Sequence, residues 1–527
     1  MLIVAVTGCS EGPISASHAD GVIYCSEGDP GGFNPQLDTS GTTADAAAHQ
    51  IYDRLIEFDP DTNNIVPALA SSWVVSADGL TYTFQLRRKV SFQKTPYFTP
   101  SRYFNADDVL FSFNRWREFD HPYHNVSGGI YPYFVSLGLE HFIESVKRIN
   151  GYRVEIKLRQ PDSSFLANLA TDFAVILSEE YAQQELVAGT PENVDNLPIG
   201  TGPFKFESYR KTSHIRYRRH ERYWGEPVQF EKLIFDITPS RSIRLAKLLT
   251  GECDAIAFPG HSDLDIIQQK TNLVLDEKPG LNIGYWAFNT LKPPFDNALM
   301  RQALAMAIDK DTLINAVYFG SAVRAKGILP PTSWAYQKNL RGTSYNPVKA
   351  RELLDEIGIQ PGFTMDIWAI PIERAYNPNS MKMAELIQGY LQQVGIKVNI
   401  VQYEWTTFRR KLREGLHDSV LIGWNADSGD PDNFYRPLFS CAAIVSGTNR
   451  ANWCSKEYDD LIDQALRYTD PQERRLFYQL ANSILQEEMP LVPIAHAYRY
   501  QAHQQHISGF KINPFGGVRF GQVKKSQ

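Results

Sequence analysis

Two charged residues, Arg374 and Asp427, each lie a few positions after a strand-like run of apolar residues. These runs cover 364–370 and 419–424. A guanidinium binds a carboxylate through paired hydrogen bonds, and a carboxylate accepts hydrogen bonds from an ammonium group. One cation and one carboxylate would therefore suit a zwitterion, such as a short peptide with free ends. The alternative interpretation is two unrelated surface charges.

The elements between these two residues predict that both lie at one edge of a sheet. The chain reads helix, strand, helix between the two runs, which predicts a β-α-β-α-β order with parallel strands. The helix expected over 380–394 has an apolar face, formed by Met383, Leu386, Ile387, Tyr390, Leu391 and Val394. In open sheets of this kind, ligands bind in the crevice at the carboxyl ends of the strands.

A polar segment near the N-terminus predicts a further part of the site. Residues 39–43 read Thr-Ser-Gly-Thr-Thr and precede an expected helix over 44–55. Hydroxyl groups cap helices, and a glycine lets a ligand approach the backbone closely. We therefore expect this segment to cap the helix and to approach the backbone of a ligand.

Size and composition indicate a globular protein of several domains. The 527 residues suggest about three domains, and the second half alternates strands and helices, which predicts an α/β fold. The net charge of −6 gives no indication of nucleic-acid binding. The 9 Trp, 26 Tyr and 29 Phe suit large cores and also a ligand cavity lined with rings.

The five cysteines favour an oxidising, exported compartment. Four of them lie in the body of the chain and permit three pairings. Cys441 and Cys454 are close in sequence and most simply bridge each other, which leaves Cys25 with Cys253. The alternative is four separate thiols in a cytosolic protein. Because no two cysteines have the CxxC spacing, a metal or redox motif has little support.

The N-terminus resembles an export segment. Residues 1–9 form a short apolar run that ends in Val-Thr-Gly-Cys, like the lipobox of bacterial lipoproteins, in which Cys9 would be acylated. The run lacks the basic residues that begin an export signal. We therefore expect an incomplete signal, the alternative being an accidental lipobox, and we interpret residues 10–20 as a tether.

Catalytic motifs are absent from the sequence. It contains no HExxH, GxSxG, GxxxxGK[ST] or GxGxxG pattern. Asp427, Asp430 and Asp432 could be read as paired carboxylates for hydrolysis, but the intervening Gly429 and Pro431 indicate a turn. We predict a protein that is not an enzyme and has no metal and no cofactor.

Longer blocks of sequence are similar to one family. Residues 69–73 and 78–87 resemble the signature of the family 5 extracellular solute-binding proteins, which deliver peptides and nickel to ABC importers. The resemblance extends over nearly the whole chain from Gly21 onward. Some blocks are similar to the dipeptide-binding branch, namely 24–28, 33–37, 39–43, 198–204 and 429–434. Others are similar to the Sap branch, namely 92–95, 247–254, 287–290 and 436–444.

This resemblance implies the periplasmic-binding-protein type II fold, an α/β architecture of two hinged lobes with an extra inserted domain. The implied boundaries are a signal and tether at 1–20, a first lobe at 21–51, 201–279 and 498–527, an extra domain at 52–200, and a second lobe at 280–497.

The resemblance also implies roles for particular residues. Asp427 would bind the ammonium of a peptide and Arg374 its carboxylate. Thr39, Ser40 and Gly41 would contact the peptide backbone from the opposite lobe, and Trp424 would line the cavity. The pairs Cys25–Cys253 and Cys441–Cys454 would match the disulfides of the family.

The function implied is a periplasmic, monomeric peptide-binding component of an ABC transporter, with or without a lipid anchor at Cys9. It would capture short peptides, dipeptides in the first place, and hand them to an inner-membrane ABC permease. One alternative is a Sap-type binder of cationic antimicrobial peptides or haem. A third possibility, of another class, is a secreted peptide hydrolase.

Overall fold

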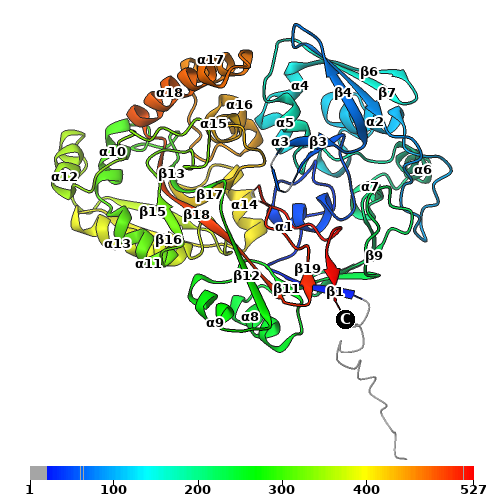
Figure 1. Ribbon diagram of the computed structural model, residues 1–527. Coiled ribbons are helices and arrows are strands. Elements are labelled where there is room, and N and C mark those ends of the chain that lie inside the picture. Colours follow the sequence, from blue (N-terminus) through cyan, green and yellow to red (C-terminus); the bar gives the residue numbers. More distant parts are fainter. Residues whose placement is uncertain (1–20, 60, 63, 514, 527) are drawn as a thin grey trace, which may run out of the picture.

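A twelve-stranded sheet runs through both lobes of the molecule in the computed structural model (Figure 1). The structure describes residues 21–59, 61–62, 64–513 and 515–526. The signal-like segment and tether expected at 1–20, including Cys9, lie outside these residues. Over the described ranges, no helix has both the length and the apolar character needed to cross a membrane.

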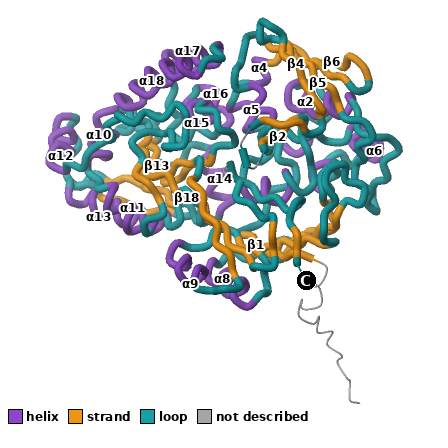
Figure 2. The backbone as a smooth tube through the Cα atoms, viewed as in Figure 1, coloured by secondary structure: helices purple, strands orange, loops and turns teal. Residues whose placement is uncertain are grey.

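The order of the strands in this sheet is β16-β15-β17-β13-β18-β11-β1-β10-β9-β8, and β12 and β14 also pair with β18. Their bounds are β1 Gly21–Ser26, β8 Phe204–Arg210, β9 His214–Arg219, β10 Lys232–Ile237, β11 Ala255–Ile256, β12 Leu273–Pro279, β13 Asn282–Phe288, β14 Ala322–Arg324, β15 Thr364–Ala369, β16 Lys397–Val401, β17 Ser419–Asn425 and β18 Leu491–Gln504. Figure 2 shows these strands as one band that crosses the molecule.

Strand β18 connects the two lobes. Its first half pairs with β13 and β14 in the second lobe, and its second half pairs with β12 and β11 in the first lobe. At the crossing, the side chain of Asn282 bonds both backbone groups of Ala497: Nδ2 donates to its carbonyl at 2.9 Å, and Oδ1 accepts from its N–H at 2.8 Å. The amide therefore continues the hydrogen-bond ladder at the point where the strands diverge.

The second lobe is an α/β layer structure, as predicted. Strand β15 is parallel to both β16 and β17, which confirms the parallel β-α-β-α-β order. Along β17, Leu421 contributes to the core on one face of the sheet, and Val420 and Ile422 to the core on the other. Helices cover both faces: α10 Ala298–Met306, α11 Lys310–Tyr318, α12 Pro347–Glu356, α13 Ser380–Gln393, α14 Trp405–Arg413, α15 Asp432–Phe439, α16 Cys441–Ser446, α17 Lys456–Arg467 and α18 Pro471–Glu488.

A separate four-stranded sheet, in the order β4-β5-β7-β6, lies within the region expected to form the extra domain. Helix α2 begins there with the predicted cap, because the side chain of Asn105 accepts from Asp107 N and Asp108 completes a capping box. One hydrophobic core continues from this sheet into the first lobe. The precise boundaries of the extra domain stay a prediction.

The remaining elements of this half of the molecule are short. The strands are β2 Ile56–Phe58, β3 Ile65–Pro67, β4 Ala70–Val75, β5 Thr81–Leu86, β6 Ile143–Asn150, β7 Arg153–Leu158, β19 Ile507–Ser508 and β20 Lys524–Lys525. The helices are α1 Gly41–Thr43, η2 Ala44–Ala48, α2 Ala106–Arg117, η3 Val126–Gly128, α3 Pro132–Ser136, α4 Leu139–Phe142, α5 Phe165–Leu169, α6 Glu179–Ala188, α7 Asn193–Asn196, α8 Arg241–Thr250, η4 His261–Asp263 and α9 Leu264–Gln268.

The helix predicted over 44–55 is shorter than expected. It starts at Gly41 as α1 and ends at Ala48 as η2. Beyond it, the carbonyls of Gln50 and Ile51 accept hydrogen bonds from Phe204 N at 2.8 Å and from Gly202 N at 2.9 Å. The prediction was wrong at its C-terminal end because these tertiary hydrogen bonds replace the helical ones.

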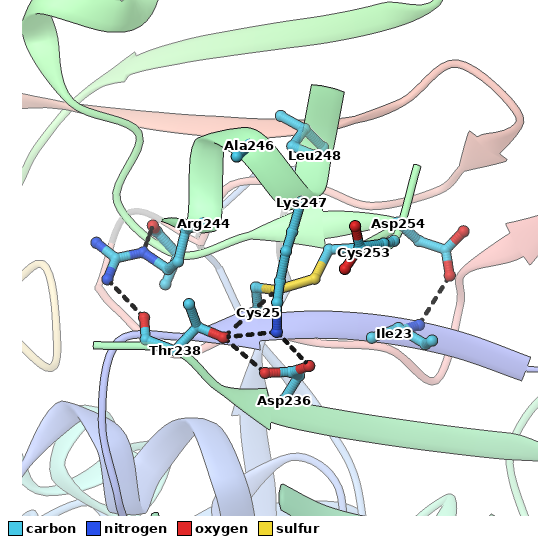
Figure 3. The surroundings of a disulfide bond; sticks show 12 residues. Ile23, Cys25, Asp236, Thr238, Arg244, Ala246, Lys247, Leu248, Cys253 and Asp254 are labelled. Carbon is cyan, nitrogen blue, oxygen red and sulfur yellow. Dashed lines mark hydrogen bonds and ion pairs between the residues drawn. A yellow bond between two sulfur atoms is a disulfide. The ribbon is translucent and has the colours of Figure 1, made fainter. Parts of the chain in front are cut away.

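Within the described residues the cysteines form two disulfides, Cys25–Cys253 and Cys441–Cys454. Figure 3 shows the first of them, which joins Cys25 of β1 to Cys253, two positions before β11 begins. Because β1 and β11 are neighbouring parallel strands, this bond lies entirely within the first lobe.

Candidate functional site

A cavity between the two lobes contains every residue that the sequence predicts to bind a ligand. Its empty space measures about 1130 Å³, including the part open to solvent, and both lobes line it. The predicted residues on its wall are Thr39, Ser40, Gly41, Arg374, Trp424 and Asp427. The structure therefore brings all six together.

Asp427 lies at the carboxyl end of β17, where the backbone is held on both sides. The N–H of Ala426 donates to the carbonyl of Leu281 at 2.8 Å, and the N–H of Asp427 donates to Oδ1 of Asn433 at 2.8 Å. Nε1 of Trp424 donates to the same oxygen at 3.4 Å. These bonds fix the carboxyl group at the wall of the cavity.

The carboxyl group of Asp427 is buried without a compensating partner. Its Oδ2 has no hydrogen-bond partner among the residues that the structure describes. Burial, and secondarily the nearby carboxylate of Asp172, raise the pKa of Asp427 well above its usual value. Although burial opposes ionisation of Asp172, His49 and Arg54 lower its pKa to about 2. Asp427 thus places at the cavity wall a carboxyl oxygen that no described residue satisfies.

The neighbouring carboxylates do not form a catalytic pair with Asp427. Asp430 makes two hydrogen bonds to Arg474, at 2.8 and 2.7 Å. Asp432 accepts from Nε of Arg436 at 3.1 and 3.2 Å. Asp430 and Asp432 are therefore both paired with arginines. Asp427 differs from them because it forms no ion pair among the described residues.

Arg374 lies on a short loop after β15, and two glycines make room for that loop. A Cβ at Gly423 of β17 would overlap the ring of Tyr376, and a Cβ at Gly284 of β13 would overlap the Tyr376 carbonyl oxygen. That carbonyl also accepts from Oη of Tyr318 at 2.6 Å. Close packing on the sheet therefore fixes the position of Arg374.

The guanidinium of Arg374 is only partly satisfied. Its Nη1 donates to Oε1 of Glu27 at 2.5 Å, and its Cζ lies 5.9 Å from the ring centroid of Phe258 and 5.7 Å from that of Trp405. Over the described part of the chain, Nη2 has no hydrogen-bond partner. Burial opposes the charge, but Glu27 outweighs this effect and the pKa of Arg374 is raised. The Nη2 group therefore remains available to an anion.

The loop that precedes α1 presents its backbone to the cavity. The hydroxyl of Ser40 donates to Oδ2 of Asp38 at 2.8 Å, and that of Thr43 donates to the same oxygen at 2.8 Å. No atom lies within 4 Å of the position that a Cβ would occupy at Gly41. Because the Ser40 hydroxyl is used internally, the backbone around Gly41 is the part of this loop best placed to meet a ligand.

Ion pairs join the two lobes around this cavity. Besides Arg374 and Glu27, Nη2 of Arg409 lies 2.7 Å from Oδ1 of Asp38. Further out, Glu373 lies 3.5 Å from the guanidinium groups of two arginines of the first lobe, Arg241 and Arg244. The lobes are therefore closed on each other, with charged groups of both at the rim.

The sequence analysis missed Glu27, Asp38 and Arg409. Glu27 comes directly after β1, so the same strand-end rule that identified Arg374 would have found it. Arg409 lies on α14 among other basic residues, Arg410 and Arg413, and nothing in its spacing separates it from them.

Potential metal ligands come close together at one place among the described residues. In the described ranges, the cluster of potential ligands is Cys25, Cys253 and Asp236, and its two sulfurs form a disulfide. Asp59, in a segment that faintly resembles a calcium loop, instead accepts hydrogen bonds from Asp61 N and Thr62 N at 3.1 and 2.8 Å, as in a polar turn.

Comparisons with known proteins agree with the fold. Residues 64–446 match the family described as bacterial extracellular solute-binding proteins, family 5 Middle. The dipeptide-binding protein of Escherichia coli K12 is 45% identical over 502 residues, which cover 95% of this chain and 94% of that protein. The peptide transport periplasmic protein SapA of Salmonella typhimurium is 44% identical over 508 residues, covering 96% and 92%.

A solved structure extends the similarity to the whole fold. The dipeptide-binding protein from Pseudoalteromonas sp. SM9913, in complex with Met-Leu, superimposes with a TM-score of 0.94. It is 47% identical, and the match covers 96% of this chain and 100% of that structure. On the family match, the extent of these identities and the shared two-lobe architecture, the chain belongs to the bacterial extracellular solute-binding proteins of family 5.

Proposed function

We propose that this protein binds short peptides, dipeptides in the first place, as the periplasmic component of an ABC importer. The observation that carries the proposal is the carboxyl group of Asp427, whose buried Oδ2 has no hydrogen-bond partner among the described residues and which shares a cavity with Arg374. Leaving a charge buried and unpaired is costly, so such a group is retained where a ligand supplies the opposite charge.

The two ends of a peptide match the two ends of this arrangement. The peptide ammonium bonds Asp427, and the peptide carboxylate bonds the free N–H groups of Arg374. The backbone around Gly41 contacts the peptide from the first lobe, and the Trp424 ring lines the cavity. A charge partner at each end limits length, because a longer peptide draws one terminus away from its partner.

Closure of the lobes explains how a binding protein of this type would work. A peptide that contacts both lobes stabilises the closed form over the open form. The permease would then recognise the closed, loaded protein. The dipeptide assignment rests on the charge pair rather than on similarity, because the dipeptide-binding and Sap relatives are almost equally similar to this chain.

Titration calorimetry with terminally blocked peptides tests the proposal. Ala-Leu should bind, whereas acetyl-Ala-Leu and Ala-Leu-amide should each lose about 2–5 kcal/mol, the cost of leaving a buried charge unpaired. In Arg374→Lys the loss with the amide should be smaller than in the wild type, because the ammonium of lysine lacks the planar guanidinium fork. Equal binding of the free and blocked peptides would rule out the assignment.

The same experiment separates binding from turnover. Mass spectrometry of the peptide after long incubation should return it intact, which is the outcome for a binding protein. Release of free amino acids would instead support the alternative of a peptide hydrolase. A preference for long cationic peptides over dipeptides would support the Sap-type alternative.

A further inference from the structure

An arginine that the peptide termini do not require, Arg450, lines the central cavity. It lies in the loop closed by the Cys441–Cys454 disulfide. The preceding residue, Asn449, is only 1% exposed and donates two hydrogen bonds to backbone carbonyls, at 3.2 and 2.7 Å. The carbonyl of Arg450 itself accepts from Nε2 of His417 at 2.8 Å. The backbone that carries this side chain is therefore firmly held.

Unlike Arg374 and Arg409, Arg450 has no anionic partner within the described residues, and Arg499, which lines the same cavity, likewise forms no ion pair there. Arg374 pairs with Glu27, and Arg409 pairs with Asp38. The side chain of Arg450 forms no hydrogen bond and no ion pair within the described residues, although it is partly buried. This leaves a positive charge at the cavity wall that no described residue neutralises, and such a charge favours an anion from outside the protein.

The electrostatic surroundings of Arg450 agree with this geometry. Burial, followed by repulsion from the guanidinium groups of Arg409 and Arg413, lowers its pKa to about 10. The group is still charged at neutral pH, and an anion beside it would relieve both effects.

The neighbours of Arg450 place it at the carboxylate end of the proposed peptide site. The loop that carries Arg450 packs against helix α14, because a Cβ at Gly447 would overlap the side chain of Arg413. At the start of the same helix, the ring centroid of Trp405 lies 5.7 Å from Cζ of Arg374. Arg374 and Arg450 also both oppose the effect of burial that raises the pKa of Tyr376. The charge that acts on Asp427 is that of Asp172 instead. A dipeptide with its ammonium on Asp427 and its carboxylate on Arg374 would therefore have its second residue next to Arg450.

We propose that Arg450 binds the side-chain carboxylate of an acidic C-terminal residue, so that the protein prefers dipeptides ending in glutamate or aspartate. This inference rests on the proposed function and adds to it the chemical class of the ligand. A hydrogen-bonded guanidinium–carboxylate pair that is shielded from water gives an advantage of about 10- to 100-fold over a neutral side chain of the same shape.

Calorimetric titration with Ala-Glu, Ala-Gln and Ala-Leu tests the inference. The wild type should bind Ala-Glu about 10- to 100-fold more tightly than Ala-Gln. Arg450→Gln should remove this difference and leave the affinity for Ala-Gln within about twofold. Arg450→Lys, which keeps the charge, should retain part of the preference. Arg410→Gln, an exposed substitution on the same helix as Arg409, serves as the matched control and should keep the whole preference.

Two results would overturn the inference while leaving the proposed function intact. One is equal binding of Ala-Glu and Ala-Gln by the wild type. The other is an equal loss for all three peptides in Arg450→Gln, which would mean that Arg450 binds the main-chain carboxylate. Failure of the wild type to bind any of the three would instead overturn the proposed function, and this inference with it. Thermal unfolding of the unliganded variants verifies that each one is folded.

Discussion

Glu27 and Arg374 form an ion pair between the lobes, with Oε1 of the first 2.5 Å from Nη1 of the second and neither side chain more than 5% exposed. Glu27 follows β1 of the first lobe, and Arg374 follows β15 of the second lobe. The pair therefore bridges the lobes through the same guanidinium that we assign to the peptide carboxylate. On the proposed function, a protein carboxylate and a ligand carboxylate would share one cation.

Replacing Glu27 with glutamine should raise the affinity for a dipeptide. The substitution removes the charge that competes for Arg374, so the peptide carboxylate gains the full attraction of the guanidinium. We expect a gain of about 1 kcal/mol and a lower melting temperature of the unliganded protein, because its closed form loses an ion pair. Calorimetry and thermal unfolding measure the two effects. Unchanged affinity would show that Glu27 only orients Arg374.

Asp427→Asn should weaken binding and stabilise the empty protein. The variant loses the charge that holds the peptide ammonium, at a cost of about 2–5 kcal/mol in affinity. It also removes a buried carboxyl whose pKa is raised. A raised pKa in the folded state means that the stability contributed by this group is present at low pH and is lost as the pH rises through that pKa. The gain in melting temperature should therefore be larger at pH 7 than at pH 4.

Peptide binding should release protons from Asp427 at pH values below its raised pKa. Burial and Asp172 raise the pKa of Asp427 in the empty protein, and the peptide ammonium would lower it in the complex. Between these two pKa values the empty protein carries a proton that the complex does not, so affinity increases with pH in this window. Calorimetry in two buffers of different ionisation enthalpy measures the released proton. The effect should vanish in Asp427→Asn.

Gly423→Ala should disrupt the position of Arg374. The added Cβ would overlap the ring of Tyr376 and the carbonyl oxygen of Ile283, so the loop that carries Arg374 must move. We expect a loss of stability of about 1–3 kcal/mol and a clear loss of peptide affinity. Gly429→Ala is the matched control, because no atom lies within 4 Å of the position of its Cβ. Equal behaviour of the two variants would contradict the packing argument.

Reduction of Cys25–Cys253 should lower stability without preventing binding. The bond spans 228 positions of sequence, for which chain-entropy theory allows up to about 5 kcal/mol. It connects neighbouring segments of the first lobe, so it does not restrict closure. The double variant Cys25→Ser/Cys253→Ser should melt earlier and bind dipeptide nearly as well. A large loss of affinity would show that the bond positions the loop after β1.

The sequence predicted the part of the site that depends on local structure. Arg374 and Asp427 were found because β15 and β17 belong to one run of alternating strands and helices, whose parallel pairing follows from chain order. Glu27 and Asp38 were missed because their partners are 347 and 371 positions away in sequence. Such contacts depend on how the lobes close, and no periodicity in the sequence encodes that.

The errors have physical causes as well. The helix expected to reach residue 55 stops at Ala48, since the carbonyls of Gln50 and Ile51 bond a segment about 150 residues later instead of their own helix. Cys441 and Cys454 could be paired from their short separation of 13 positions, whereas Cys25 and Cys253 could be assigned only by elimination.

The continuity of β18 also sets the order in which the molecule can be made. The second lobe is contiguous from β13 to the first half of β18, so a growing chain can complete it as one unit. The first lobe still lacks the second half of β18 at that moment, although Cys25 and Cys253 have both been synthesised. The half of the protein that begins the chain is therefore the last to be finished. Its disulfide can form before its sheet is complete. The bond would then hold β1 beside β11 until the second half of β18 has been synthesised and pairs with the sheet.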